Sequence, residues 1–125
     1  MNRLITISAI LFSILTVSIV SIAYAKNAND KIFVKISGIE ANANEKSDTL
    51  LSSITDLSEY WHKKERFLST FVRHDEIEKV NLSLSKIKKL AEVEMFGELK
   101  IELEQIRFFV DHILNRELPT YENIF

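Results

Sequence analysis

The sequence contains no cysteine. Disulfide bonds, thiolate nucleophiles and cysteine-ligated zinc sites are therefore excluded. A chain without such links must be held together by a packed hydrophobic core, and 125 residues allow one compact domain of modest size.

Glycine and proline are almost as scarce, with two glycines and a single proline, Pro119. A sheet protein of this size would need several tight turns, so the composition predicts an all-α fold. The same scarcity excludes phosphate-cradling and oxyanion loops, and no G-x-S-x-G turn is present. We therefore expect no enzyme activity and no cofactor.

Charge of one sign does not dominate any part of the chain. The sequence has 16 Lys and Arg against 18 Asp and Glu, a net charge of −2, and the two signs are interleaved. Such a surface does not attract the phosphate backbone strongly, so no nucleic-acid partner is expected.

One long hydrophobic run is present, at the N-terminus. Leu4 to Ala25 carries no charge and would extend about 33 Å as a helix, against a hydrocarbon core of about 30 Å. Arg3 and the ending Ala23-Tyr24-Ala25 also fit a cleaved secretory signal.

We favour an uncleaved anchor over residues 1–25, because the run exceeds the usual ~7 to 15 residues of a signal core. Membrane lipid is then a partner through residues 4–25, and the C-terminal domain lies outside the cytoplasm in a single-pass topology. The alternative is a protein secreted after cleavage following Ala25. The lysines at 26, 31 and 35 oppose export, because positive charge prefers the cytoplasmic side. We keep the outward orientation because the start of the chain resembles a secretory signal.

Residues 26–117 show helical periodicity throughout. The first stretch carries Ile32, Ile36, Ile39 and Ala43, and is either a short helix or a continuation of the hydrophobic segment. Asn42 followed by Glu45 predicts an N-cap and its reciprocal partner, where a second helix would begin. The buried stripe of that helix is predicted to comprise Leu50, Ile54, Leu57, Trp61, Leu68 and Phe71.

Two further helices follow. A corner is expected near Arg73, with Asp75 and Glu78 as a second capping pair, and a turn is expected over residues 92–95. Helix three carries Ile77, Val80, Leu84, Ile87 and Ala91, and helix four carries Phe96, Leu99, Leu103, Ile106, Val110 and Ile113. Helix four ends before Pro119, and residues 118–125 form a short tail.

About four amphipathic helices with short connections fit two architectures, an antiparallel helical bundle or stacked helical hairpins of the tetratricopeptide type. The sequence leaves both open.

The first candidate site is a metal site where helices three and four meet. If these helices are antiparallel, His74 and Glu78 could approach Asp111 and His112, and imidazoles with carboxylates are ligands for divalent cations. The favoured interpretation is structural, with Glu78 in a cap and His112 complementing a helix C-terminus. No HExxH motif supports a metal.

A docking surface is the second candidate. Trp61 and Phe71 lie at core spacing on the stripe of helix two, whereas Ile101, Phe108 and Phe109 lie off the main stripe of helix four. A second apolar face there would be free to contact a partner.

Three segments carry a family resemblance, Trp61-His62-Lys63-Lys64, Phe71-Val72-Arg73-His74-Asp75-Glu76-Ile77 and Asn81-Leu82-Ser83-Leu84. There the chain resembles the DUF4363 family, small bacterial membrane-anchored helical proteins of unknown function, over nearly its whole length. The resemblance implies an anchored helical protein of Gram-positive, often spore-forming bacteria with no established activity. It transfers no mechanism and no catalytic residue.

The sequence thus predicts a membrane-anchored extracytoplasmic helical protein that serves as an interaction or accessory module of a membrane or envelope complex. Its partner there would be a membrane or envelope protein. The alternative is a bundle that captures a small extracytoplasmic ligand between its helices. A divalent-metal-dependent enzyme is the weakest of the three hypotheses.

Overall fold

The structure is a computed structural model that describes residues 1–117, with side chains through Asn115. It contains no strand over those residues, which confirms the all-α fold class. The elements in chain order are α1 (Asn2–Asn42), α2 (Asp48–Leu68), α3 (His74–Glu92), α4 (Phe96–His112) and a π-helical turn, η1 (Ile113–Glu117). The tail predicted for residues 118–125, with Pro119, lies outside the described residues.

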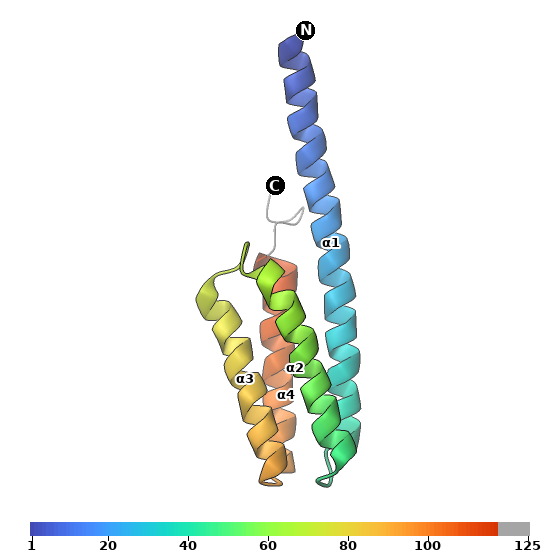
Figure 1. Cartoon of the computed structure of the whole chain (residues 1–125), viewed down its shortest axis with the longest axis vertical. Helices are drawn as coiled ribbons and strands as arrows, with labels where there is room; N and C mark the ends of the chain where they lie inside the picture. The colour runs from blue at the N-terminus through green and yellow to red at the C-terminus, as the bar shows by residue number, and fades with distance from the viewer. Residues whose placement is uncertain (118–125) are drawn as a thin grey trace.

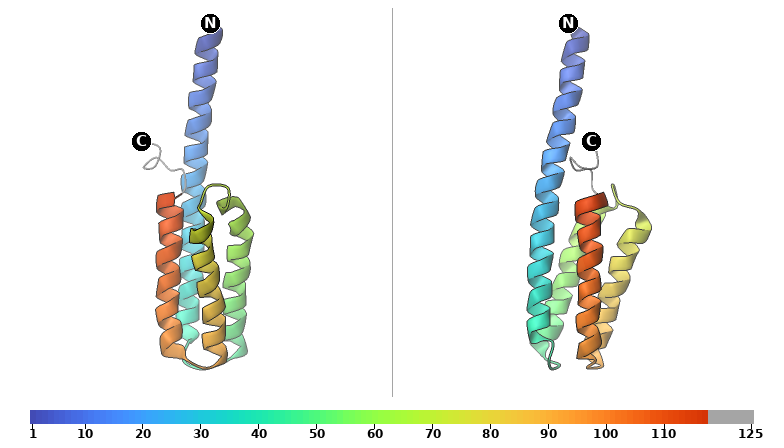
Figure 2. Two further views of the ribbon diagram at one scale, coloured as in Figure 1. Left: turned by 90° about the vertical axis from the view of Figure 1, so that its left-hand side faces the viewer. Right: turned by 180° about the vertical axis from the view of Figure 1, so that it is seen from behind.

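The four helices form an antiparallel bundle. Each helix packs against the next one in the chain, and α4 closes the ring by packing against α1 (Figure 1). The α2–α3 turn and the end of α4 lie at one end, from which α1 projects, and the other two turns lie at the opposite end (Figure 2). This ring is a bundle, not a stack of hairpins, so the first of the two predicted architectures is correct.

Helix α1 has two parts with different surroundings. Residues before Ser18 are exposed on every side, with Leu4 70% and Phe12 71% exposed. From Ser18 onward one face is buried, and Ala25 is the first apolar residue of the core. The helix is unbroken between these parts, so the predicted boundary at residue 25 is not a break in secondary structure.

The exposed part of α1 is strongly apolar. An 18-residue window of this helix has a mean hydropathy of 2.4, and only 11% of that window is buried. By length and composition, α1 can therefore cross a membrane.

Most residues of the predicted helical stripes lie in the core. Each buried Leu or Ile there contributes about 1.5–3 kcal/mol relative to an exposed one. All five predicted residues of α3 are buried, as are Leu99, Leu103, Ile106 and Val110 of α4, whereas Phe96 at the start of α4 is only partly buried against the core. Ile113 and Leu114 in η1 are both fully buried, although they are consecutive.

The predicted start of the second helix is wrong. Asn42 is the last residue of α1, and its side-chain Nδ2 donates to the carbonyl of Gly38 at 3.1 Å. Ser47 caps α2 instead, because its hydroxyl accepts a hydrogen bond from the amide of Leu50 at 3.1 Å. A serine hydroxyl in this position satisfies one of the free amides of the first turn.

The predicted stripe of α2 is correct up to Leu68 but not at Phe71. Helix α2 ends at Leu68, so Phe71 lies in the following turn and is 41% exposed. Val72 is buried in its place. A 3.6-residue period cannot be extended beyond the residue at which the helix stops.

The capping pair predicted for α3 is also wrong. Arg73 occupies the N-cap position without a side-chain cap bond, and Asp75 lies inside the first turn. Arg73 instead binds Asp75 through Nη2 at 3.0 Å. A negative charge in the first turn still complements the positive end of the helix dipole.

Arg107 joins α4 to α1. Its guanidinium contacts Glu40 through two nitrogens, at 2.7 and 3.2 Å, and donates to the hydroxyl of Ser37 at 3.0 Å. A forked contact of this kind fixes both distance and orientation, so it sets the register of the two helices.

Candidate functional site

The predicted docking residues lie on the outside of α4. Ile101 is 63% and Phe108 69% exposed, and the seven-residue spacing places both on one face of the helix. Phe109 is half-buried, and its ring meets that of Phe108 edge-on at a centroid distance of 6.1 Å. Gln105 and Glu104 are exposed between them, so the apolar surface is interrupted.

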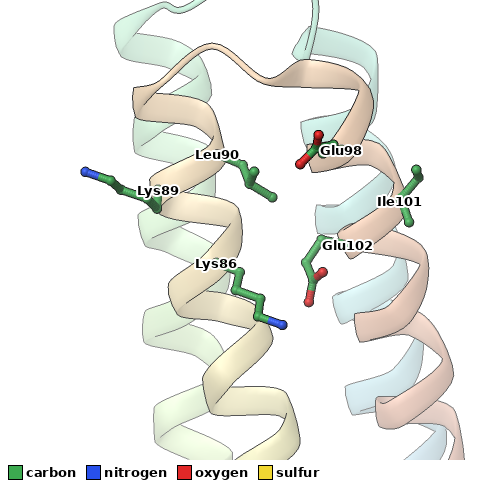
Figure 3. Close-up of a pocket in the computed structure, with 6 residues that line it drawn as sticks. All are labelled: Lys86, Lys89, Leu90, Glu98, Ile101 and Glu102. Atoms are coloured by element: carbon green, nitrogen blue, oxygen red, sulfur yellow. The ribbon is translucent and has the colours of Figure 1, made fainter.

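A groove of about 410 Å³ lies between α3 and α4. Leu90 and Lys86 from α3 extend into it, opposite Glu98 and Glu102 from α4 (Figure 3). Ile101 lines its edge, so the groove is continuous with the exposed face of α4. The lining combines two lysines, two carboxylates and two aliphatic side chains.

Glu102 is the unusual residue of this groove. It is only 8% exposed, and its Oε1 is buried without a hydrogen-bond partner in the described part of the chain. An unpartnered buried carboxylate oxygen is costly, and natural structures satisfy most such atoms with protein, water or ligand. Helical spacing could have located Glu102, because it lies three residues after Leu99 and four before Ile106 on the core side of α4.

The metal candidates are not gathered into one site. His74 Nε2 and Glu78 Oε1 lie 3.5 Å apart, but both side chains are largely exposed. Asp111 accepts a hydrogen bond from Asn115 at 2.6 Å, and His112 is half-buried near the end of α4. Within residues 1–117, no three His, Asp or Glu side chains are grouped so that they could hold a metal ion.

A polar chain between α2 and α3 was not expected from the sequence. Trp61 Nε1 donates to Asn81 Oδ1 at 2.9 Å, and Asn81 Nδ2 donates to Glu65 at 2.8 Å. Glu65 also lies 2.9 Å from Nδ1 of His62. The hydrogen bonds from His62 and then Asn81 lower the pKa of the Glu65 carboxyl below its ordinary value. These contacts are structural, since they close a seam of the bundle.

A comparison with family models identifies the family of the chain. The family described as a domain of unknown function, DUF4363, matches residues 19–124, which is most of the chain. The chain therefore belongs to this family. No curated protein and no solved structure matches it.

Proposed function

We propose that this DUF4363 protein is a membrane-tethered, non-catalytic interaction module, in which α1 is the uncleaved tether and the bundle docks on a neighbouring membrane or envelope protein. The bundle would lie outside the cytoplasm. The observation that carries the proposal is the exposure of Ile101 and Phe108 on one face of α4. Large exposed apolar and aromatic side chains near a groove are typical centres of protein interfaces.

The packing of α1 supports an uncleaved tether. Cleavage after Ala25 would cut within a continuous helix, at a residue that is 3% exposed. It would also remove Tyr24, whose ring lies 4.4 Å from that of Phe67. A mature protein starting at Lys26 would lose these contacts, so retention of the segment favours the folded bundle.

Intact mass and fractionation of the natively expressed chain test the tether. A full-length mass in the membrane fraction is expected. A mass that begins at Lys26 in the soluble or released fraction would instead favour the secreted alternative.

Photo-crosslinking in intact cells tests the docking face. A photoreactive phenylalanine analogue replaces Phe108 in one variant and Ile101 in another, and a third variant carries it at Val34. Val34 is 72% exposed and lies beside Tyr60 of α2, away from α4, so it is a matched control. We expect one membrane or envelope protein to be captured from positions 101 and 108 but not from position 34. Equal capture at all three positions, or none at 101 and 108, would overturn the proposal.

A second candidate function is supported by Glu102. Its unpartnered carboxylate, with Lys86 across the groove, suits a small ligand that carries both a positive and a negative group. A thermal shift screen of zwitterionic metabolites would test this, with Glu102→Gln as the matched variant. Stabilisation of the native chain but not of the variant is expected, and flat melting curves throughout would end this candidate.

A further inference from the structure

The length of α1 limits how far the bundle can stand from a membrane. The part that is free of the bundle runs from residue 2 to residue 17 and spans about 24 Å at ~1.5 Å per residue. The hydrocarbon core is about 30 Å thick, so this free part of α1 is too short to cross it. A tilted helix would cover even less of the membrane thickness. Because α1 is one unbroken helix, no flexible linker can make up the difference.

The end of the bundle from which α1 projects therefore falls within the membrane interface. A span of ~20 residues that starts at Leu4 reaches the far boundary next to Tyr24. The buried residues Ser18 and Ser21 lie before that point, so the bundle already contacts α1 at a depth where lipid is expected. The α2–α3 turn lies at the same end (Figure 1).

Aromatic side chains are concentrated at this level. The ring of Phe67 lies 4.4 Å from that of Tyr24 and 5.2 Å from that of Phe71, so the three form one cluster. Phe67 is 37% and Phe71 41% exposed, so neither is fully used by the core. Aromatic rings at the boundary between hydrocarbon and headgroups anchor proteins in membranes.

Cationic side chains flank the cluster on α2. The Lys64 ammonium lies 5.1 Å from the ring centroid of Tyr24, and Lys63 and Arg66 are exposed on the last turns of the helix. The nearby carboxylates of Asp75 and Glu76 contact Arg73 and Lys79. Glu65 lies among these cations, but its carboxylate is bound by Asn81 and His62. The end of α2 thus presents more positive than negative charge, which can bind anionic lipid phosphates.

We propose that this end of the bundle is seated in the lipid headgroup layer, with Tyr24, Phe67 and Phe71 as its anchoring side chains. The inference rests on the proposed tether and adds a second contact with the membrane. Lipid is the occupant that the geometry favours over a protein, because the short free part of α1 brings the bilayer itself to these residues.

Depth-resolved fluorescence quenching on the full-length chain tests the inference. The absence of cysteine allows single-cysteine variants to carry one fluorescent label each. Thr70→Cys reports the α2–α3 turn, Phe12→Cys reports the span, and Val93→Cys reports the far end of the bundle. Vesicles of phosphatidylcholine and phosphatidylglycerol carry a quencher either near the headgroup or deep in the acyl chain.

The label at position 70 should be quenched several-fold more strongly by the shallow quencher than the label at position 93. The label at position 12 should respond to the deep quencher. If position 12 is not quenched, the tether itself fails. If position 12 is quenched but position 70 resembles position 93, the tether stands and the headgroup contact is overturned.

A substitution then tests the aromatic anchor. Phe71→Ser is placed in the Thr70→Cys background, with Phe108→Ser as the control, since Phe108 is also exposed but lies on α4. Phe71→Ser should reduce shallow quenching at position 70 several-fold, and Phe108→Ser should not. Equal quenching in both variants would show that the aromatic cluster does not anchor the bundle.

Discussion

The indole Nε1 of Trp61 on α2 donates a hydrogen bond to Oδ1 of Asn81 on α3 across 2.9 Å. Trp61 is 1% exposed, so Asn81 is the group that allows this large side chain to be buried with its polar atom satisfied. The same amide donates to Glu65, which extends the contact into a chain across the α2–α3 seam.

Asn81→Ala should therefore lower the free energy of unfolding by about 1–3 kcal/mol, the usual cost of leaving a buried donor unpaired. Urea unfolding monitored by the fluorescence of Trp61 measures it. Asn44→Ala is the control, because Asn44 accepts its hydrogen bond from Lys100 at an exposed site and should change stability by less than about 0.5 kcal/mol. If both variants changed the free energy of unfolding equally, the hydrogen bond from Trp61 to Asn81 would not stabilise the bundle.

Glu65 gives the bundle a pH dependence of defined sign. Its pKa in the folded state lies below the ordinary value of 4.5, because the bonds to His62 and Asn81 stabilise the carboxylate. The stabilisation that results is fully present above the pKa that Glu65 has in the unfolded state. It is lost as the pH falls through the pKa that Glu65 has in the folded state. The free energy of unfolding should therefore fall on acidification below about 4.5.

Glu65→Gln should reduce the loss of unfolding free energy on acidification below about pH 4.5. Urea unfolding at a series of pH values measures it. Glu59→Gln is the control, because Glu59 is exposed and has no ion pair among residues 1–117. If the Glu65 and Glu59 variants gave the same pH profile, the hydrogen bonds to Glu65 would not stabilise the folded state.

Ser47→Ala should cost about 1 kcal/mol, because it removes the side-chain acceptor for the amide of Leu50. Asn42→Ala distinguishes this cap from the one that the sequence pattern suggested. Asn42 lies at an exposed helix end, so its replacement should change stability by less than about 0.5 kcal/mol. Thermal unfolding followed by circular dichroism compares the two, and a larger loss for Asn42→Ala would reverse the assignment.

Helical periodicity was sufficient to predict most of the fold. Apart from Phe96, which is partly buried, the stripes of α3 and α4 are buried as expected, because apolar residues at every third or fourth position share one helix face. The corner before His74 and the turn at residues 93–95 were predicted because charged residues occupy the positions at which each apolar stripe would otherwise continue.

Helix ends were predicted less well, because several residues near each end can cap it. Asn42 and Ser47 both precede an apolar run, and only the backbone conformation selects Ser47. Phe71 was assigned to the core for a related reason, since periodicity does not show where α2 stops.

The candidate site depended on contacts between helices. The exposure of Ile101 and Phe108 followed from their position outside the stripe of α4, so the sequence was sufficient to locate them. The groove beside Glu102 and the bond from Trp61 to Asn81 join different helices. Their partners are set by the relative rotation of the helices, which a one-dimensional pattern does not contain.

The turn between α3 and α4 contains a residue in a conformation that favours glycine. Glu94 has φ 62°. Its backbone amide donates a hydrogen bond to the carbonyl oxygen of Ala91, and the backbone amide of Met95 donates to the carbonyl oxygen of Leu90. These two bonds form the Schellman motif that ends many helices, usually with glycine at the left-handed position. A side chain there costs about 1–2 kcal/mol, and a carboxylate at a helix C-terminus adds an unfavourable interaction with the dipole.

Glu94→Gly should therefore stabilise the bundle, although glycine also raises the entropy of the unfolded chain by the equivalent of about 0.4–1 kcal/mol. The net gain expected is several tenths to about 1 kcal/mol, measured by urea unfolding. Glu94→Gln removes the charge but keeps the side chain, so it should recover only the smaller electrostatic part. If the glycine variant were no more stable than the glutamine variant, relief of backbone strain would not contribute, and the charge alone would account for the change.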